Sequence, residues 1–418
     1  RMRNGLMFTK ILNWFDDRFP VTDTFERHLS KYPAPIGQNF WYLAGVLLVV
    51  VLVIQLISGI WLMMNYEATT EGAFASIQYI MRDVDYGWII RYMHTTGSSL
   101  FFLLIYLHMF RGLLYGSYQK PRELLWVLGW LTYFILVMEG FTGYVLPWGQ
   151  MSFWAAQVIF SLIGAIPIIG EDLLTWIRGD YLISGITLNR LFTFHVVLLP
   201  LLLIAVVFVH IIALHEVGSN NPEGVDVKKH LDKDGVPLDT VPFFPYDVTK
   251  DIFAVGVFLI VFCGIVFFFP DGGGYLIEYI NYEPADNLKT PDHIVPAWYY
   301  TPFYAMLRAI TFPIGPLTAK FLGFIVFSAA MVIIAIVPWL DKSPVKSIRY
   351  KGIYSKLALT VLVISFFVLG YLGMVPPNTF RTLLAQIFTA LYFLYFLLMP
   401  FYTKYEKCRK VPDRINIL

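Results

Sequence analysis

The sequence predicts an all-α membrane protein that crosses the bilayer eight times. Of its 418 residues, 57% are hydrophobic and only 14% are charged, and the mean hydropathy is +0.63. Apolar runs of about 20 residues recur along the whole chain, and a helix of that length crosses a hydrocarbon core of about 30 Å. Ordinary soluble domains carry far more charge, so a soluble globular fold is excluded.

The predicted spans fall into two groups of four helices. The charged connection 216–250 separates the groups, which predicts an N-terminal region 1–235 and a C-terminal region 236–418. Two long connections, 147–190 and 271–320, lie on the opposite side of the membrane, and connections of that length are usually functional. We expect helices at 40–64, 88–115, 124–146, 191–215, 251–270, 321–340, 357–374 and 382–402.

The distribution of basic residues predicts the orientation. The net charge is only +2, which gives no indication of a nucleic-acid partner. Of the 31 Lys and Arg residues, 23 lie on the side that holds both termini, and basic connections face the cytoplasm. We therefore expect both termini in the cytoplasm. The N-terminal segment has no cleavable signal pattern, so the first apolar run is the expected insertion signal.

Four of the eight histidines lie inside predicted spans, where ionisable residues are rare and usually functional. His94 and His108 are 14 residues apart on one face of the second span, with a rise of about 21 Å. His195 and His210 are 15 residues apart on the fourth span, which runs in the same direction. His94 is therefore level with His195 near the outer surface. His108 is level with His210 near the inner surface, which predicts two stacked bis-imidazole sites.

Glycines on the neighbouring spans provide room for a flat group at each site. Gly45 and Gly59 lie 14 residues apart on the first span, and Gly129 and Gly143 have the same spacing on the third. Two imidazoles on opposite faces of a plane suit haem iron, whereas zinc takes three or four protein ligands in a tetrahedron. The sequence thus predicts an N-terminal four-helix bundle that holds two stacked b-type haems. The alternative is that the histidines only form hydrogen bonds between helices.

Two arginines flank the histidines of the second span. Arg91 precedes His94 by three residues and Arg111 follows His108 by three, so each lies one turn closer to a membrane surface. A guanidinium group there could pair with a haem propionate. The alternative is that both side chains simply extend to the interface.

Three segments resemble cytochrome b of the cytochrome bc complex, ubiquinol:cytochrome c oxidoreductase. They read RDVDYGWIIRYMHTTGSSLFFLLIYLHMFRGLLYGS, GYVLPWGQMSFW and HEVGSNNPEG, and the similarity extends over essentially the whole chain. The resemblance implies two non-covalent haems b with ubiquinone and ubiquinol as substrates. It also implies a Rieske iron–sulfur protein and cytochrome c1 as partners, within a homodimeric complex. The loop 228–240 looks like an insertion relative to mitochondrial forms, so we expect a bacterial inner membrane.

The resemblance also assigns residues to two quinone sites. An outer site oxidises quinol near the low-potential haem, and an inner site reduces quinone near the high-potential haem. The inner-site residues are His215, Ser219, Asn220, Lys250 and Asp251. The outer-site residues are Phe141, Gly143, Tyr144, the segment 147–154, Pro296, Trp298, Tyr299 and Tyr304.

Two features depart from the family pattern. The 15-residue spacing of His195 and His210 is that of the chloroplast-type protein, where the mitochondrial form has 14, and the extra residue is expected near Pro200. In the family motif Pro-Glu-Trp-Tyr, the glutamate is expected to accept a quinol proton. The motif reads Pro-Ala-Trp-Tyr here, and the Ala297 side chain has no group that can accept a proton. Glu139, four residues before Gly143 on the same helix face, is the acceptor that the sequence suggests. The alternative is a neutral carboxyl group that forms a hydrogen bond between helices.

Two other functions fit part of the pattern. A membrane-anchor cytochrome b of a quinone-linked dehydrogenase also holds two haems, but it is usually shorter and lacks the long aromatic connection. A transporter explains the spans and leaves the four histidines without a role.

Overall fold

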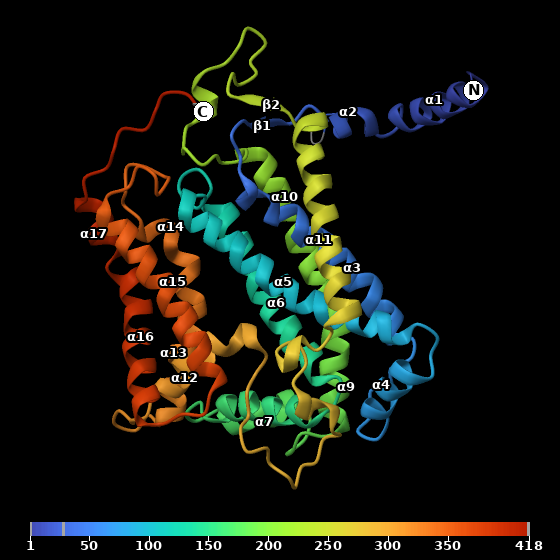
Figure 1. Ribbon diagram of the computed structural model, residues 1–418, viewed down its shortest axis with the longest axis vertical. Helices are drawn as coiled ribbons and strands as arrows, with labels where there is room; N and C mark the ends of the chain where they lie inside the picture. The colour runs from blue at the N-terminus through green and yellow to red at the C-terminus, as the bar shows by residue number, and fades with distance from the viewer. Residues whose placement is uncertain (1, 27–29, 416–418) are drawn as a thin grey trace.

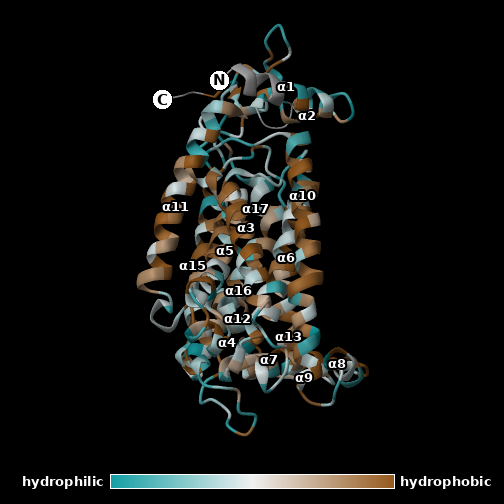
Figure 2. Ribbon diagram, turned by 90° about the vertical axis from the view of Figure 1, so that its right-hand side faces the viewer, coloured by the Kyte–Doolittle hydropathy of each residue, from teal (hydrophilic) through white to brown (hydrophobic). Residues whose placement is uncertain are grey.

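The computed structural model describes residues 2–26 and 30–415. Long helices run side by side between two ends, and both termini lie at the same end (Figure 1). Apolar residues dominate the middle of these helices, while polar residues gather in the loops at the two ends (Figure 2). Eight helices in the described part of the chain are long and apolar enough to cross a membrane, which confirms the predicted fold class. They are Phe40–Met63, Gly87–Tyr115, Glu123–Val145, Gly185–Val217, Phe243–Phe268, Ala319–Leu340, Ile353–Met374 and Thr379–Leu397.

The elements are numbered in chain order, and Figure 1 labels most of them. The first half contains α1 (Met2–Asp16), α2 (Val21–Phe25), β1 (Pro33–Pro35), α3 (Ala44–Met63), α4 (Gly72–Arg82), α5 (Gly87–Tyr115), α6 (Glu123–Val145), α7 (Gln150–Gly164), α8 (Gly170–Arg178), α9 (Gly185–Thr193), the π-helix η3 (Phe194–Leu198) and α10 (Leu199–Val217). The second half contains β2 (Thr240–Pro242), α11 (Val248–Phe268), η7 (Tyr279–Tyr282), η8 (Trp298–Tyr300), α12 (Thr301–Ala309), α13 (Ala319–Val332), α14 (Val337–Leu340), α15 (Ile353–Met374), α16 (Thr379–Leu397) and α17 (Met399–Tyr405).

Three span boundaries differ from the sequence prediction by five residues or more. The fourth span begins at Gly185 instead of 191, because the N–H of Ser184 donates to the Thr187 hydroxyl at 3.2 Å and caps the helix earlier. The fifth begins at Phe243 instead of 251, directly after β2. The eighth ends at Leu397 instead of 402, because Pro400 opens the separate helix α17.

The long connection 147–190 is mostly helical. Helix α7 is apolar but has only 15 residues, too few to cross a hydrocarbon core of about 30 Å. It lies across the outer end of the molecule (Figure 1) and packs against α8. Its buried side chains Phe153 and Phe160 pack with Trp148 and Leu188 in a second core cluster. The connection is therefore a packed cover over the outer end of the bundle.

The helices form two packed groups. In the first group, α3 packs against α5 and α6 packs against α10, and α11 lies against α3 and α5. In the second group, α12 packs against α13, α15 and α16. The strands β1 and β2 pair antiparallel, which joins the N-terminal segment to the connection before α11. The division of the chain at residue 235 stays a prediction, and α11 packs with the helices that precede it.

A buried carboxylate joins the two groups at the inner end. Asp341, just after α14, accepts hydrogen bonds from Tyr118 at 2.7 Å and Gln119 at 2.8 Å, both of which follow α5. Lys351 pairs with the same carboxylate at 2.5 Å, and both charged side chains are almost fully buried. Burial alone would raise the pKa of Asp341, but Lys351 and the hydrogen bonds outweigh it and hold the pKa below its usual value.

We expect Asp341→Ala to destabilise the protein by about 3–5 kcal/mol, because it leaves the Lys351 ammonium buried without its partner. Thermal unfolding in detergent measures this as a lower Tm. The exposed Asp234 serves as a matched control, and Asp234→Ala should leave the Tm unchanged. Equal Tm values for the two variants would show that the Asp341 cluster does not hold the two groups of helices together.

Candidate functional site

The outer histidine pair faces across the bundle from α5 and η3. The ring centroids of His94 and His195 are 6.1 Å apart and their planes are nearly perpendicular, at 86°. Ser58 donates its hydroxyl proton to the Ile54 carbonyl at 2.6 Å, so the Nδ1–H of His94 donates to Ser58 at 2.9 Å. Each imidazole that uses Nδ1 as a donor keeps Nε2 free to bind a metal.

His195 lies in an irregular turn of its helix. Its Nδ1 donates to the backbone carbonyl of Glu139 at 3.1 Å. The surrounding residues Phe194–Leu198 form a π-helix, in which the Leu199 N–H donates to the Phe194 carbonyl, five residues earlier. The sequence placed the extra residue near Pro200, and this turn directly precedes it. Because Pro200 has no N–H to donate, the helix can widen here and absorb one residue between the two histidines.

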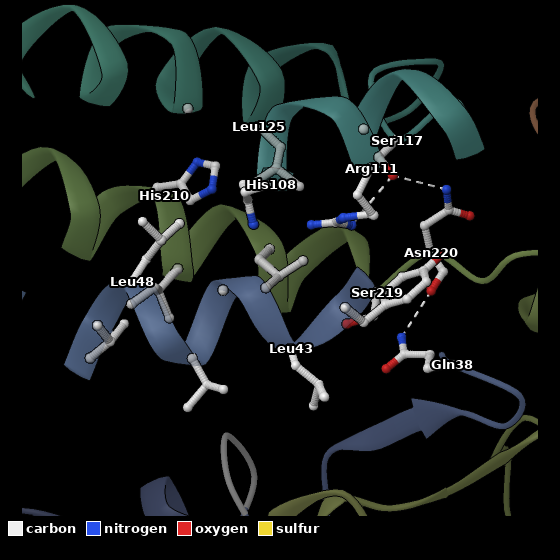
Figure 3. A pocket seen from close by; sticks show the side chains of 18 of the residues that line it. Gln38, Leu43, Leu48, His108, Arg111, Ser117, Leu125, His210, Ser219 and Asn220 are labelled. Carbon is white, nitrogen blue, oxygen red and sulfur yellow. Dashed lines mark hydrogen bonds between the residues drawn. The ribbon is translucent and has the colours of Figure 1, made fainter. Parts of the chain in front are cut away.

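The inner pair lies in a large cavity. His108 from α5 and His210 from α10 both line a cavity of about 890 Å³ near the inner end. Figure 3 shows both imidazoles and the Arg111 guanidinium directed into this space. Leu43 and Leu48 line the same space from the α3 side. The cavity is therefore apolar along the bundle and polar toward the inner surface.

Each of the four glycines faces the histidine expected at its depth. A Cβ added at Gly59 would lie 3.2 Å from His94 Cε1, and one at Gly45 would lie 3.6 Å from His108 Cε1. On α6, a Cβ at Gly129 would lie 3.1 Å from His210 Cε1. A Cβ at Gly143 would clash with His195 Cε1. A side chain at any of these positions would occupy space beside an imidazole.

The two arginines differ in their surroundings. Arg111 lines the inner cavity, stacks on the Tyr42 ring with its guanidinium carbon 4.9 Å from the ring centroid, and donates to Ser117 at 3.4 Å. Its Nε is buried with no hydrogen-bond partner among the described residues. Arg91 donates to the Thr95 hydroxyl one turn along α5. Arg111 therefore has a donor left for an acidic group in the cavity.

All five residues assigned to the inner site line the same cavity as His108 and His210. His215 packs against Tyr32, with ring centroids 4.8 Å apart, and the Tyr32 hydroxyl accepts from the Ser219 N–H at 3.0 Å. Asn220 donates to the Tyr115 carbonyl at 2.8 Å, which fixes its loop. The full set is His215, Ser219, Asn220, Lys250 and Asp251.

Lys250 and Asp251 lie in the first turn of α11 and line the same cavity. The Lys250 ammonium pairs with Asp247 at 2.9 Å, so its charge is partly compensated. His215 at the end of α10 and Asp251 thus place a base and an acid in one cavity near the inner surface.

The outer-site residues come together around η8. Tyr299 stacks on Phe102 of α5, with ring centroids 3.8 Å apart, and Trp298 donates to Ser99 at 3.3 Å. Tyr304 donates to the Ile294 carbonyl at 3.2 Å. These contacts hold the segment that contains Pro296 and Ala297 against α5. Phe141 packs against Phe160 of α7 on the other side.

The two glutamates near the outer end have different partners. The Glu139 carboxylate lies 3.1 Å from His195 Nδ1, and its second oxygen is buried with no hydrogen-bond partner among the described residues. Tyr144 donates to a different glutamate, Glu278, at 2.8 Å. The hypothesis that Glu139 accepts a quinol proton stays a prediction.

Sequence reasoning missed several residues at these sites. Tyr32 and Gln38 reach the inner cavity from an N-terminal segment with no recognisable pattern, and Gln38 donates to the Asn220 carbonyl at 2.9 Å (Figure 3). Ser58, the partner of His94, is an ordinary small residue in an apolar span. For Glu278 a signal was available, because the loss of the motif glutamate at 297 directs attention to other carboxylates in the same connection.

The fold and these sites define a multi-pass membrane protein with two pairs of histidines inside its helical bundle. Two family models match the chain: "Cytochrome b/b6/petB" over residues 29–218 and "Cytochrome b(C-terminal)/b6/petD" over residues 284–393. Cytochrome b of Allochromatium vinosum is 53% identical over 98% of this chain and 99% of that protein. Cytochrome b of Rhodospirillum rubrum is 45% identical, with 97% and 96% covered.

A solved structure described as "Hyperthermophilic respiratory Complex III" has the same fold. Its TM-score is 0.86 at 36% identity, and the match covers 94% of this chain and 99% of that one. The chain belongs to the cytochrome b family.

We expect Gly129→Val to prevent a planar group from entering beside His210, because even a Cβ would lie 3.1 Å from the imidazole. The reduced-minus-oxidised optical spectrum should lose about half of its b-type haem signal. Gly256 on α11 has open space around it, so Gly256→Val is the matched control and should keep the full signal. An unchanged spectrum in Gly129→Val would contradict the assignment of this space to a haem.

Proposed function

We propose that the chain is the cytochrome b subunit of a respiratory complex III, with a quinol-oxidising site at the outer end and a quinone-reducing site at the inner end. The observation that carries the proposal is the arrangement of four imidazoles inside the helical bundle, one pair ring to ring and the other pair in one cavity, each imidazole next to a glycine. Membership of the cytochrome b family supports it. The alternative of a dehydrogenase anchor is not favoured, because the matches to cytochrome b extend over 98% of the chain.

The residues fit two haems b. His94 with His195 and His108 with His210 are the ligand pairs, and the outer pair has the separation that one metal ion between two imidazoles needs, with metal–nitrogen bonds of about 2 Å. The cavity of about 890 Å³ around the inner pair, free of side chains at Gly45 and Gly129, has room for a macrocycle. Arg111 would hold an acidic edge of the inner group, and Arg91 is the corresponding candidate at the outer one.

When bound, the two haems supply one-electron transfer between the outer and inner sites, about 21 Å apart along the bundle. The protein binds quinone at the inner cavity, where Ser219 and Asn220 shape the wall. His215 and Asp251 are placed to deliver protons from the inner side to a quinone that is being reduced. At the outer end Pro296, Trp298, Tyr299 and Tyr304 form an aromatic wall, with Tyr144 as a hydroxyl donor.

Partner subunits complete this function. The resemblance implies a Rieske iron–sulfur protein and cytochrome c1 as partner subunits in a homodimeric complex. That complex would carry out a proton-translocating Q cycle. The similarity to a structure of a complex III supports partner subunits in general. The proposed location is a bacterial inner membrane with both termini in the cytoplasm. Copurification of a c-type haem and an iron–sulfur subunit with the chain tests this assembly, and a complex with neither would contradict it.

We expect His210→Leu to remove one haem and leave the other, because the leucine cannot ligate iron. Haem quantitation and the optical spectrum of the purified complex measure this. His230 lies in the connection before β2, and His230→Leu is the control that should keep both haems. Two haems with an unchanged spectrum in His210→Leu would contradict the ligand pairing.

We expect His215→Leu combined with Asp251→Asn to slow quinone reduction at the inner cavity and to spare quinol-driven reduction at the outer end. Both substitutions remove a proton-exchanging group from the inner wall. Stopped-flow spectroscopy resolves the two sites kinetically. An equal loss at both ends would contradict the inner-site assignment.

A further inference from the structure

Glu278 occupies a distinct position at the outer end. It precedes η7 in the connection 271–320, and its Oε2 accepts a hydrogen bond from the Tyr144 hydroxyl at 2.8 Å. Tyr144 is the second-last residue of α6 and directly follows Gly143, which faces His195. The hydrogen bond therefore links the connection to the part of α6 that borders the outer histidine pair.

The other carboxylates of this connection are engaged elsewhere or exposed. Asp271 and Asp286 each accept a hydrogen bond from the backbone two residues later, at 3.2 and 2.8 Å. Glu283 is largely exposed and lies 3.8 Å from Lys289, and Asp292 is exposed. Among the five carboxylates in 271–320, Glu278 alone contacts a phenol hydroxyl of the outer site.

The surroundings of Glu278 contain few charges. Burial raises its pKa to about 7, although hydrogen bonds from its own backbone N–H and from Tyr144 act in the opposite direction. The titratable groups that face it are Tyr144 from α6 and Tyr299 from η8, whose pKa is raised by burial and by the Glu278 charge. Helix α7, which packs against η7, carries no charged residue. Near neutral pH this carboxyl group can therefore change its protonation state.

We propose that Glu278, through the Tyr144 hydroxyl, accepts a proton from quinol at the outer site. The inference rests on the proposed function. The quinol O–H bond breaks, its proton passes to the Tyr144 oxygen, and the phenol proton passes to the Glu278 carboxylate, so Tyr144 is unchanged overall. The two electrons of the quinol would go to two one-electron acceptors, an iron–sulfur protein and the outer haem. Glu278 takes one of the two quinol protons, and the other would leave with the electron that the iron–sulfur partner accepts.

This assignment accounts for the alanine at position 297. In the family motif the glutamate directly precedes Trp-Tyr, and here Ala297 lies buried at the start of η8. Tyr299, two residues later, lies near Glu278, so the carboxylate reaches the same region from another part of the connection. Glu139, in contrast, contacts the imidazole of His195.

The test is the pH dependence of ubiquinol:cytochrome c turnover in the purified complex. The wild-type rate should rise with pH through about 7, because only the ionised carboxylate can accept a proton. Glu278→Gln keeps the shape and the Tyr144 hydrogen bond but removes the base. It should lower the turnover rate at pH 7.5 about tenfold and abolish the increase of the rate with pH. The haem spectrum should be unchanged. Glu278→Asp should keep the rise at a reduced rate.

Three further variants sharpen the test. Ala297→Glu added to Glu278→Gln should restore part of the rate, since it returns a carboxylate to the family's usual position. Tyr144→Phe, which keeps Glu278 and removes the relay hydroxyl, should also slow turnover. Glu283→Gln is the matched control in the same connection and should behave as wild type.

A pH rise near 7 that persists in Glu278→Gln would overturn the proposal, whether or not the rate falls. Loss of that rise in Glu139→Gln alone would also overturn it and assign the proton to Glu139. A wild-type complex that does not oxidise quinol at all would contradict the proposed function itself.

Discussion

The structure is constrained by the unfavourable free energy of placing four imidazoles in the apolar interior of a membrane bundle. A polar ring in hydrocarbon is unfavourable unless its nitrogens find partners. Two helices place the rings in facing pairs, and the neighbouring helices contribute glycines beside them. At the outer pair Ser58 and the Glu139 carbonyl take the Nδ1 protons, which directs the remaining nitrogens toward the space between the rings. In the proposed function, a haem iron in that space would bind the nitrogens that the protein leaves free.

The same constraint explains why the two ends of the molecule differ. At the inner end, one continuous cavity joins a histidine pair to residues that can exchange protons with the adjacent solution. At the outer end, α7 and the segment around η8 cover the bundle, and aromatic side chains close it from water. In the proposed function, oxidation at the outer end releases protons on one side of the membrane, and reduction at the inner end takes up protons on the other. The proposed function follows from this asymmetry together with the stacked pairs.

Periodicity predicted the fold class and the depth of the histidines because a membrane helix has a fixed rise and the bilayer a fixed thickness. The same arithmetic matched each glycine with a histidine, and the structure places Gly59 and Gly129 beside His94 and His210. The π-helix around His195 could only be located approximately, because the spacing reveals an extra residue but not the turn that absorbs it. The contact between Tyr144 and Glu278 joins residues 134 positions apart, and no local pattern predicts such a contact.

The most direct test of the account is the haem content and ligation of the purified complex, measured by haem quantitation together with near-infrared magnetic circular dichroism of the oxidised state. We expect two haems b for each copy of this chain, both low-spin and both with two imidazole ligands. A single haem for each chain, or a haem with any ligand other than a second imidazole, would contradict it.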